Sequence, residues 1–373
     1  MDVKAVVKNV IKKIFRIIFE TILKISAVIF KLFPLKERVC FYSIRNNDSL
    51  VENEQSVYDK LDCEKIVLAN MLPHSHLLIF KIYFYLLTSK VVVTDDYLKY
   101  LRYITLRKEQ KVVQIWHACG AFKKFGLDAP LKMKREDEAR THSRYDAVCV
   151  SSEYVKDYYC SAFGISKDKI FATGVARTDK LFDKEYIEKT KEKIKEKYNF
   201  FNGKKIYLYT PTFREKNNQY IKFDTKIDFK KLSDSLNDDE VFVVKRHPVM
   251  KEPYFENNEF EKIYDLTNES VLDLMIVADT VVTDYSSVIF EAVLLGKKIL
   301  VYCPDFEEYD RSFYISYPDE LPGNVVKESS ELLQEIRNSQ IDSKTETFKN
   351  KELFSCDGHS AEKTAKLIIE FLK

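Results

Sequence analysis

The sequence contains no long uncharged hydrophobic run, no CxxC pair and no low-complexity tract. A helix that crosses a bilayer needs about 18 or more apolar residues in a row, so the first absence argues against a spanning segment. The seven cysteines are an odd number, and several lie in apolar, strand-like runs. This usage is typical of reduced core residues in a cytosolic protein and argues against a disulfide framework.

The chain does contain enough apolar sequence for two domains. It has 373 residues, of which 45% are hydrophobic and 32% are charged, and this is a globular composition. That length is long for one compact domain and allows two domains that each bury a core. We do not expect nucleic acid as a partner, because the chain beyond residue 31 is slightly acidic and shows no interleaved aromatic and basic residues.

Basic charge gathers at the amino end. Residues 1–31 carry seven Lys or Arg against two acidic residues. Charged side chains recur there every four residues, and at about 100° per residue they occupy one half of a helical wheel, with apolar residues on the other half. The segment also lacks a small-residue cleavage site, which argues against a signal peptide. We expect residues 1–34 to form a basic amphipathic helix, ended by Pro34, on an anionic membrane surface. The alternative is a helix that docks on the protein's own core.

Beyond this helix, strand-like and helix-like runs alternate. The strand candidates are residues 38–44, 65–70, 90–96, 111–117, 146–152, 169–175, 206–215, 240–248, 278–287 and 297–305. This alternation predicts mostly parallel sheets. The charge-dense stretch DKEYIEKTKEKIKEKYNFFNGKK reads as a solvated helix at a domain boundary. We therefore expect an α/β chain with two doubly wound domains, one over residues 35–185 and one over residues 186–373.

The segment QIWHACGAFKKFG, residues 114–126, holds the only Trp of the chain and leaves the carboxyl end of a predicted strand. Open α/β sheets place their sites at such ends. His117 suits a general base, because imidazole titrates near neutrality, and a structural histidine is the alternative. Lys123 and Lys124 are weak candidates for holding an acceptor phosphate, with solvated surface as the alternative.

The second half carries the candidate residues for an anionic ligand. In VVTDYSSVIFEAVLLG, a strand ends in a turn of small hydroxyl residues at the start of a helix. Such a helix start binds phosphate, although Ser and Asp are also ordinary capping residues. Three further loops follow apolar strands and converge on the same sheet edge, and their guanidinium, ammonium and imidazole groups indicate a di-anionic ligand. The candidates are Thr212, Arg214, Lys245, His247, Thr283, Asp284, Ser286, Ser287 and Arg311.

Taken in order, the motifs WH…G…K…G, G…RD, PT-R, K-HP, TDYSS, a late Arg and DGHSAEKTA resemble the CDP-glycerol glycerophosphotransferase family, which includes teichoic acid primases and polymerases. The resemblance runs from about residue 38 to the end of the chain. It implies a GT-B fold of two Rossmann-like domains in a bacterial protein at the cytoplasmic face of the cell membrane. It also implies transfer of an alditol phosphate, glycerol phosphate first of all, from a CDP-alditol to a lipid-linked polyol-phosphate or glycan acceptor, with release of CMP. Teichoic acid or capsule-type polymers are the implied products.

Carried over by position, the family's catalytic-base histidine matches His117 and its donor-contacting histidine matches His247. The hydroxyl residues of TDYSS and the late arginine match the candidates named above. Two loops depart from the family pattern: the WH loop lacks the Thr-Pro that commonly follows WHG in the polymerases, and GVARTD lacks a proline before Arg177. No DxD-like metal pair lies on a site loop, so neither a metal nor another cofactor is expected, and Asp95–Asp96 is only a weak metal candidate.

Two other functions remain open at this point. A GT-B glycosyltransferase that uses a nucleotide sugar would share the fold, the diphosphate site and the membrane helix. A non-catalytic membrane-bound scaffold on the same fold is the other alternative, and the intact basic and histidine positions argue against it.

Overall fold

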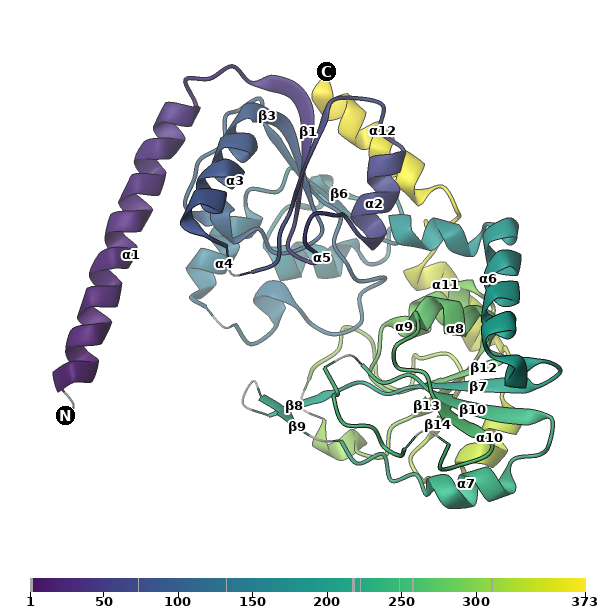
Figure 1. The fold of residues 1–373 in the computed structure, drawn as a ribbon. Helices are drawn as coiled ribbons and strands as arrows, with labels where there is room; N and C mark the ends of the chain where they lie inside the picture. Colours follow the sequence, from purple (N-terminus) through teal and green to yellow (C-terminus); the bar gives the residue numbers. More distant parts are fainter. Residues whose placement is uncertain are drawn as a thin grey trace. The chain divides into compact units, whose positions relative to one another are not determined.

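The computed structural model describes residues 3–373 apart from Pro73, Lys132, Asn217, Asn218, Lys222, Pro248, Asn257 and Asp310. The chain divides into two compact units (Figure 1). Unit 1 comprises Met1–His117, Phe125–Arg177 and His359–Lys373, and unit 2 comprises Ala118–Lys124 and Thr178–Gly358. The expected division at residues 185 and 186 therefore differs from these units in three segments. The carboxyl-terminal segment belongs to unit 1, and residues 118–124 and 178–185 belong to unit 2.

Unit 1 contains a parallel six-stranded sheet in the order β2-β1-β3-β4-β5-β6. Its strands are β1 (Lys36–Ser43), β2 (Lys65–Ala69), β3 (Ser89–Thr94), β4 (Lys111–Gln114), β5 (Ala147–Cys149) and β6 (Ile170–Phe171). From residue 38 onward every side chain of β1 is buried, which is typical of a parallel strand covered on both faces. The strand order reverses between β1 and β3, and doubly wound sheets bind their ligands at such a switch point.

Helices of unit 1 come from both ends of the chain. They are α1 (Val3–Phe30), α2 (Glu52–Asp59), α3 (His76–Thr88), α4 (Arg135–His142), α5 (Lys156–Phe163) and α12 (Ser360–Leu372). The buried residues Ala361, Ala365 and Ile368 of α12 follow helical spacing and join the core cluster that contains Val91 and Val93 of β3. This packing explains why the last helix belongs to unit 1.

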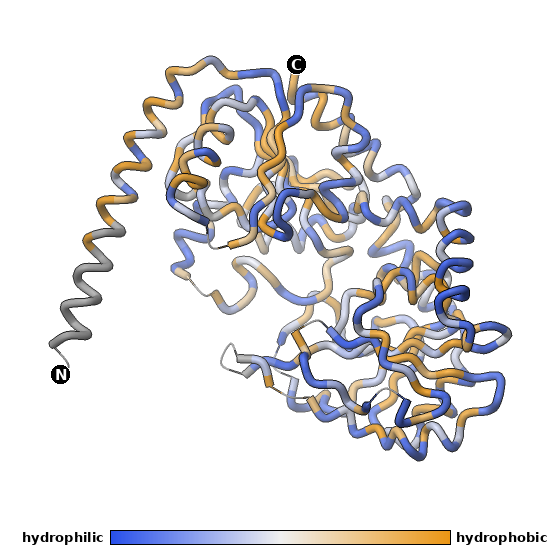
Figure 2. The backbone as a smooth tube through the Cα atoms, in the orientation of Figure 1, coloured by the Kyte–Doolittle hydropathy of each residue, from blue (hydrophilic) through white to orange (hydrophobic). Residues whose placement is uncertain are grey.

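Unit 2 contains a second parallel six-stranded sheet, in the order β11-β10-β7-β12-β13-β14. Its strands are β7 (Lys205–Thr210), β10 (Glu240–Val244), β11 (Ile263–Asp265), β12 (Thr280–Thr283), β13 (Lys298–Tyr302) and β14 (Asn324–Val326). The order reverses between β7 and β12, as in dinucleotide-binding sheets. Its helices are α6 (Lys184–Lys197), α7 (Phe229–Ser235), α8 (Val271–Val277), α9 (Val288–Leu294), α10 (Leu332–Asn338) and α11 (Ser343–Glu352). Figure 2 shows the inner strands of both sheets as apolar segments.

The prediction of two doubly wound parallel sheets is confirmed. The structure adds elements that the sequence did not reveal: the edge strands β11 and β14, and an antiparallel hairpin of β8 (Arg214–Lys216) and β9 (Gln219–Ile221). The edge strands are three residues long and only partly buried, so they lack the apolar run that marks an inner strand. Strands β4 and β10 end before His117 and His247, which places both histidines in loops at the carboxyl edge of a sheet.

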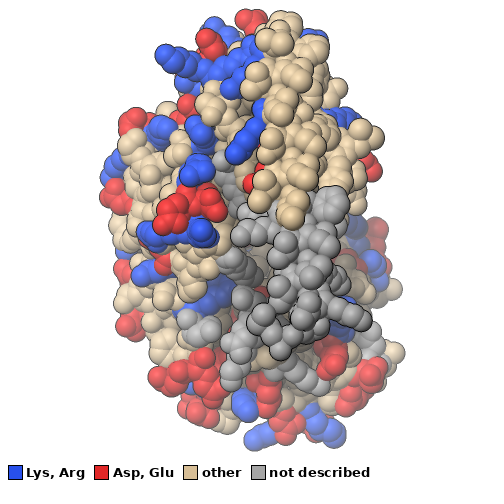
Figure 3. All heavy atoms as spheres, turned by 90° about the vertical axis from the view of Figure 1, so that its left-hand side faces the viewer, with Lys and Arg blue, Asp and Glu red and all other residues tan. Residues whose placement is uncertain are grey.

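Helix α1 has two apolar faces with different surroundings. Leu23 and Ala27 are buried, and the Phe30 ring packs edge-to-face on Phe84 of α3 with 5.5 Å between centroids, so one face docks on the protein's own core. The exposed apolar residues of the other face include Ile14, Ile18, Ile22, Ile25 and Ile29. Figure 3 shows uncharged side chains along the described part of this helix. The expected basic side chains of residues 4–13 and of Arg16 lie outside the described residues. Within the described chain, no helix is long and apolar enough to cross a membrane.

Candidate functional site

His117 lies just beyond β4, at the carboxyl edge of the unit 1 sheet. The residue before it, Trp116, has φ +48°, a left-handed conformation that turns the chain sharply where the strand ends. The His117 ring nitrogen Nδ1 lies 2.9 Å from the carbonyl oxygen of Asp95, directly after β3. A carbonyl oxygen only accepts, so Nδ1 carries the proton of the neutral ring and Nε2 keeps its lone pair. Nε2 is therefore the atom that can accept a proton from a ligand.

The surroundings of His117 favour this neutral ring. Burial lowers its pKa, while the carboxylate of Asp96 acts in the opposite direction. The guanidinium groups of Arg45 and Arg177 also lower the pKa, and the net shift is downward. A general base must be unprotonated before it acts, so the downward shift keeps His117 in the active form at pH 7.

The amide side chain of Asn53 ties the His117 loop to a neighbouring segment. Its Nδ2 donates to the carbonyl of Trp116 at 2.8 Å, and its Oδ1 accepts from the backbone N–H of Arg177 at 2.8 Å. The Arg177 guanidinium donates to the carbonyl of His117 and pairs with Glu52 at 3.3 Å. Because Asn53 is buried, these bonds fix the backbone on both sides of the imidazole.

Two fully buried carboxyl groups interact near this edge: that of Asp95, directly after β3, and that of Glu54 on α2. Asp95 pairs with Arg45 at 3.1 Å. Burial raises the pKa of Asp95 to about 7 and the pKa of Glu54 to about 9. Sequence reasoning missed Arg45, Asn53 and Glu54, although Arg45 follows β1 closely and the strand-end rule points to it. Among the described residues, no group of three His, Cys, Asp or Glu is arranged to hold a metal ion.

The unit 2 edge is organised around Arg214, which begins the β8 strand. Its Nε donates to Asp305 Oδ2 at 2.6 Å, and its Nη2 donates to Asp284 Oδ2 at 2.9 Å. Asp284 is fully buried and also accepts from the backbone N–H of Thr212 at 2.9 Å. The buried hydroxyl of Thr283 donates to a β7 carbonyl at 3.2 Å. The structure thus brings four expected residues together, and Arg214, Asp284 and the Thr212 backbone bond one another, whereas the buried hydroxyl of Thr212 has no hydrogen-bond partner among the described residues.

A short segment from the first half of the chain, residues 118–124, docks on unit 2 and brings Lys123 to this edge. Lys123 forms an antiparallel β-bridge with Phe313. Gly120 has φ +66°, and a Cβ at that position would lie 2.2 Å from a carbon of the Phe290 ring. Any other residue at position 120 would be strained and would clash, so glycine allows the close approach of the segment.

Lys123 lies among aromatic and charged groups of unit 2. Its Nζ lies 5.5 Å from the centroid of the Tyr309 ring, which stacks on Tyr285 at 3.6 Å. Burial lowers the pKa of Lys123 to about 7, against the carboxylate of Asp284 and with help from the guanidinium of Arg311. At pH 7, Lys123 is therefore balanced between its charged and neutral forms, and an arriving anion would favour the charged one.

His247 lies just beyond β10. Its ring packs 4.7 Å from that of Phe213, and its Nδ1 accepts from the backbone N–H of Val249 at 3.2 Å. The proton of the neutral ring is therefore on Nε2. Partial burial lowers the pKa of His247, and Lys245 and Lys123 lower it further. At pH 7, the ring is a neutral hydrogen-bond donor.

The remaining basic candidates differ in how available they are to a ligand. The side chain of Arg311 is 45% exposed and pairs with Glu215. The Lys245 ammonium donates to the carbonyl of Thr267 at 2.7 Å, and burial lowers its pKa. Lys124 is exposed. Of these three, Arg311 is the best placed to bind an anion, because replacing its exposed ion pair with Glu215 by a pair with the ligand costs little free energy.

The hydroxyl residues Ser286 and Ser287 are half-buried at the start of α9. The Ser286 Oγ accepts from the backbone N–H of Val288 at 3.4 Å. Position and burial are compatible with both capping and ligand contact.

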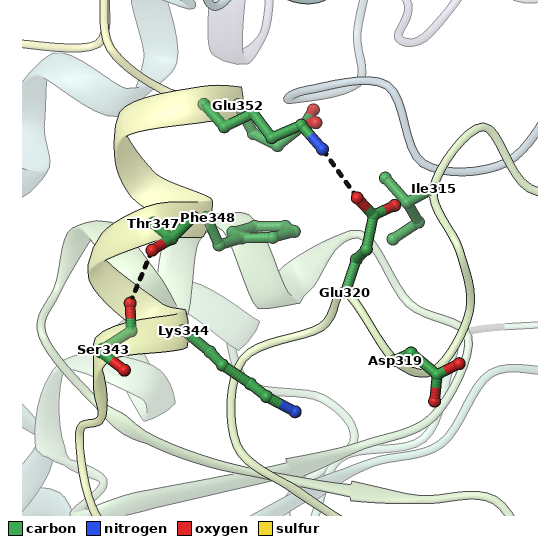
Figure 4. Close-up of a pocket in the computed structure, with 9 residues that line it drawn as sticks. Ile315, Asp319, Glu320, Ser343, Lys344, Thr347, Phe348 and Glu352 are labelled. Atoms are coloured by element: carbon green, nitrogen blue, oxygen red, sulfur yellow. Dashed lines mark hydrogen bonds and ion pairs between the residues drawn. The ribbon is translucent and has the colours of Figure 1, made fainter.

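A separate cavity in unit 2 has a volume of about 180 Å³ and lies between α11 and the loop that carries Ile315 and Glu320 (Figure 4). Lys351 pairs with Glu320 at 2.8 Å. Glu352, at the end of α11, accepts from the backbone N–H of Ala121 at 3.3 Å, and burial raises its pKa to about 7. The hydrogen bond between Glu352 and Ala121 therefore holds the segment that carries Lys123 against this side of the cavity. None of the residues predicted for the site lines the cavity.

Comparison with known proteins gives a family for most of the chain. The family model described as CDP-Glycerol:Poly(glycerophosphate) glycerophosphotransferase matches residues 29–370. The teichoic acid ribitol-phosphate primase of Bacillus spizizenii is 32% identical over 388 residues, which cover 98% of this chain and 98% of the primase. The teichoic acid glycerol-phosphate primase of Bacillus subtilis is 33% identical over 289 residues, which cover 76% of this chain and 74% of that protein.

Solved structures agree with the fold described above. The wall teichoic acid polymerase TagF has a TM-score of 0.76 at 20% identity, with 100% of this chain and 98% of that chain covered. MnaA of S. aureus in complex with UDP has a TM-score of 0.56 at 14% identity, with 91% and 97% covered. These likenesses confirm the GT-B-like fold, and the family match favours the glycerophosphotransferase resemblance over the nucleotide-sugar alternative. The chain belongs to the CDP-glycerol:poly(glycerophosphate) glycerophosphotransferase family, and it is a primase- or polymerase-type transferase of glycerol or ribitol phosphate, from a CDP-alditol, in teichoic acid synthesis.

Proposed function

We propose that the chain transfers glycerol phosphate from CDP-glycerol to a hydroxyl group of a membrane-linked acceptor, with His117 as the general base. The acceptor hydroxyl gives its proton to Nε2 of His117, and its oxygen forms a bond to the β-phosphorus that carries the glycerol. The bond from that phosphorus to the oxygen of CMP breaks, and CMP leaves. The observation that carries this proposal is the hydrogen bond between Nδ1 and Asp95, together with the lowered pKa of the ring.

We assign the donor diphosphate to the edge of the unit 2 sheet. Lys123, Arg311 and His247 supply two cationic groups and one N–H donor there, and the small hydroxyls of Ser286 and Ser287 complete the set. These groups would meet the charge that develops on the leaving CMP. The sequence suggested an acceptor role for the lysine. We assign it to the donor because its ammonium shares its surroundings with Arg311 and Asp284.

Fewer observations bear on the acceptor than on the donor. The names of the primase relatives support a teichoic acid acceptor, and TagF has been studied after a soak with CDPG, which supports the donor. The exposed apolar face of α1 and the basic composition of residues 1–31 support attachment to an anionic bilayer at the cytoplasmic face of the membrane. A lipid-linked acceptor would then meet the enzyme at the surface where its own anchor lies.

The test is the mass of the product. Purified protein is given CDP-glycerol, CDP-ribitol or a UDP-sugar with a lipid-linked polyol-phosphate acceptor, and the acceptor is expected to gain one glycerol phosphate. A gain of ribitol phosphate would change the donor and keep the reaction. A gain of a sugar would contradict the proposal. His117→Ala is the matched negative control, and Lys184→Gln, an exposed change on α6, is the positive control.

A further inference from the structure

Unit 1 contains a polar cavity that takes no part in the proposed transfer. It has a volume of about 480 Å³ and lies between α1, the segment that follows the short helix η1 (Lys99–Arg102), and α4. The charged and hydroxyl side chains that matter here are those of Glu20, Lys24, Thr105, Asp137, Arg140 and Arg144. Three bases against two acids leave an excess of one positive charge in the lining.

Two basic residues of this cavity have no ion-pair partner among the described residues and can therefore pair with an anion. Within the described part of the chain, neither Arg140 nor Arg144 has an ion-pair partner, and the buried Nε of Arg144 has no hydrogen-bond partner. A buried guanidinium donor without a partner costs free energy, which a bound oxygen atom recovers. Guanidinium groups match the paired oxygens of a phosphate better than ammonium groups do. The lining therefore fits a phosphate group.

The position of the cavity beside α1 indicates which kind of molecule carries that phosphate. Around the helix, Lys24 lies between the buried face that contains Ala27 and the exposed apolar stripe that contains Ile25 and Val28. A helix that lies in a bilayer by such a stripe places its border residues at the level of the lipid headgroups. Figure 3 shows charged side chains beside the uncharged surface of α1. The cavity would then open at the depth of the lipid phosphates.

We propose that this cavity binds the phosphodiester of an anionic membrane phospholipid, with phosphatidylglycerol as the simplest case. The proposal rests on the proposed attachment of α1 to a bilayer. The charge balance favours this ligand, because a phosphodiester carries one negative charge and the lining has one positive charge in excess, whereas inorganic phosphate is partly doubly charged near pH 7. The forked guanidinium of Arg144 would hold two of the phosphate oxygens, and the hydroxyl of Thr105 would meet the polar headgroup.

The first experiment is sedimentation with vesicles. Wild-type protein is expected to sediment with vesicles that contain phosphatidylglycerol and poorly with pure phosphatidylcholine. The variant Arg140→Gln/Arg144→Gln is expected to lose affinity for the anionic vesicles on the order of 30-fold, from about 1 kcal/mol for each basic residue near the surface. The matched control is Lys184→Gln/Lys195→Gln, which removes the same charge from the exposed surface of α6 and should bind as wild type does.

A second variant separates a shaped site from general attraction of charge. Arg144→Lys keeps the charge and removes the forked guanidinium, so a phosphate site loses about tenfold in affinity, whereas diffuse attraction loses nothing. Short-chain phosphatidylglycerol, below its micelle concentration, is the probe for calorimetry, and inorganic phosphate is the comparison. Transfer to a water-soluble acceptor analogue should be unchanged in every variant, which shows that the variants are folded.

The outcomes separate the membrane attachment from the headgroup site. If wild-type protein ignores anionic vesicles, both the membrane attachment and the headgroup site are wrong. If wild type and Arg144→Lys bind anionic vesicles equally well, the attachment stands and the headgroup site is wrong. If inorganic phosphate binds as tightly as the short-chain lipid, the cavity is a site for free anions, and the lipid assignment is overturned.

Discussion

Burial shifts pKa values in opposite directions at the two sheet edges. At the unit 1 edge burial acts on acids: it raises the pKa of Asp95 to about 7 and that of Glu54 to about 9, beside a histidine whose own pKa is lowered. At the unit 2 edge burial acts on a base and lowers the pKa of Lys123 to about 7. Each edge therefore holds fewer charges at neutral pH than its composition suggests.

The difference matches two tasks. An edge that removes a proton from a hydroxyl needs a neutral base, and unit 1 supplies it in His117. An edge that receives a diphosphate needs positive charge when the ligand arrives, and unit 2 can supply it by protonating Lys123. Both edges also contain an ion pair, Arg45 with Asp95 in unit 1 and Arg214 with Asp284 in unit 2.

The largest expected effect is at His117. His117→Ala should lower kcat by roughly 10²–10⁴-fold, the usual contribution of general acid–base catalysis, and should leave donor affinity nearly unchanged. The base acts in its deprotonated form and its pKa is lowered, so wild-type kcat/KM should fall on the acid side with an apparent pKa below the ordinary imidazole value of about 6.5. Initial rates and donor competition binding across pH test both statements. A variant that loses donor binding in proportion to its activity would make His117 a donor ligand.

The second effect compares the two ion pairs, Arg214 with Asp284 and Arg45 with Asp95. Arg214→Ala leaves Asp284 buried without its partner and should lower the free energy of unfolding by roughly 3–5 kcal/mol. Arg45→Ala should cost less near neutral pH, because Asp95 has its pKa raised to about 7 and can take up a proton. Denaturant unfolding at pH 6 and pH 8 measures both variants. Equal losses in the two variants would show that the edges do not differ in this respect.

The third effect is a dependence of donor binding on pH. Lys123 is charged below pH 7 and neutral above it, so binding of the dianionic donor above pH 7 requires uptake of a proton. Donor affinity of the wild type should therefore fall by up to about tenfold per pH unit above pH 7, until the pKa of the donor-bound form is reached. Lys123→Gln should bind about tenfold more weakly at pH 6.5 and should show no such slope. Lys124→Gln is the matched control, because its side chain is exposed. Calorimetry in buffers of different ionisation enthalpy would count the protons, and a count of zero would remove Lys123 from the donor site.

The positions of the candidate residues could be predicted from the sequence because their causes are local. His117, His247 and the TDYSS turn each follow a short apolar strand, and the carboxyl ends of parallel strands share one edge. The family motifs then fixed their order. The two doubly wound sheets followed from the same alternation of strand and helix.

The orientations could not be predicted, because they depend on contacts between distant segments. Arg214 turns inward to meet Asp305, 91 residues away. Lys123 reaches the unit 2 edge because its segment pairs with Phe313, and no pattern within the first half of the sequence indicates that pairing. Glu54 lies on a helix, outside every motif, and only the fold brings it to the strand ends.

The smallest effect is expected at Arg311, whose charge at the edge of unit 2 is partly exposed to solvent. Its side chain is 45% exposed and pairs with Glu215, and such exposed pairs contribute at most about 1 kcal/mol to stability. Arg311→Ala should therefore leave unfolding unchanged and raise the KM for the donor about five- to tenfold, through loss of one charge-assisted hydrogen bond to the diphosphate. Glu215→Gln should have the opposite effect, because it frees the guanidinium for the ligand. Steady-state kinetics over the full donor range compares the two variants. If Arg311→Ala keeps the wild-type kcat/KM, the guanidinium contacts solvent and Glu215 only, and the donor charge is met by Lys123 and His247 without it.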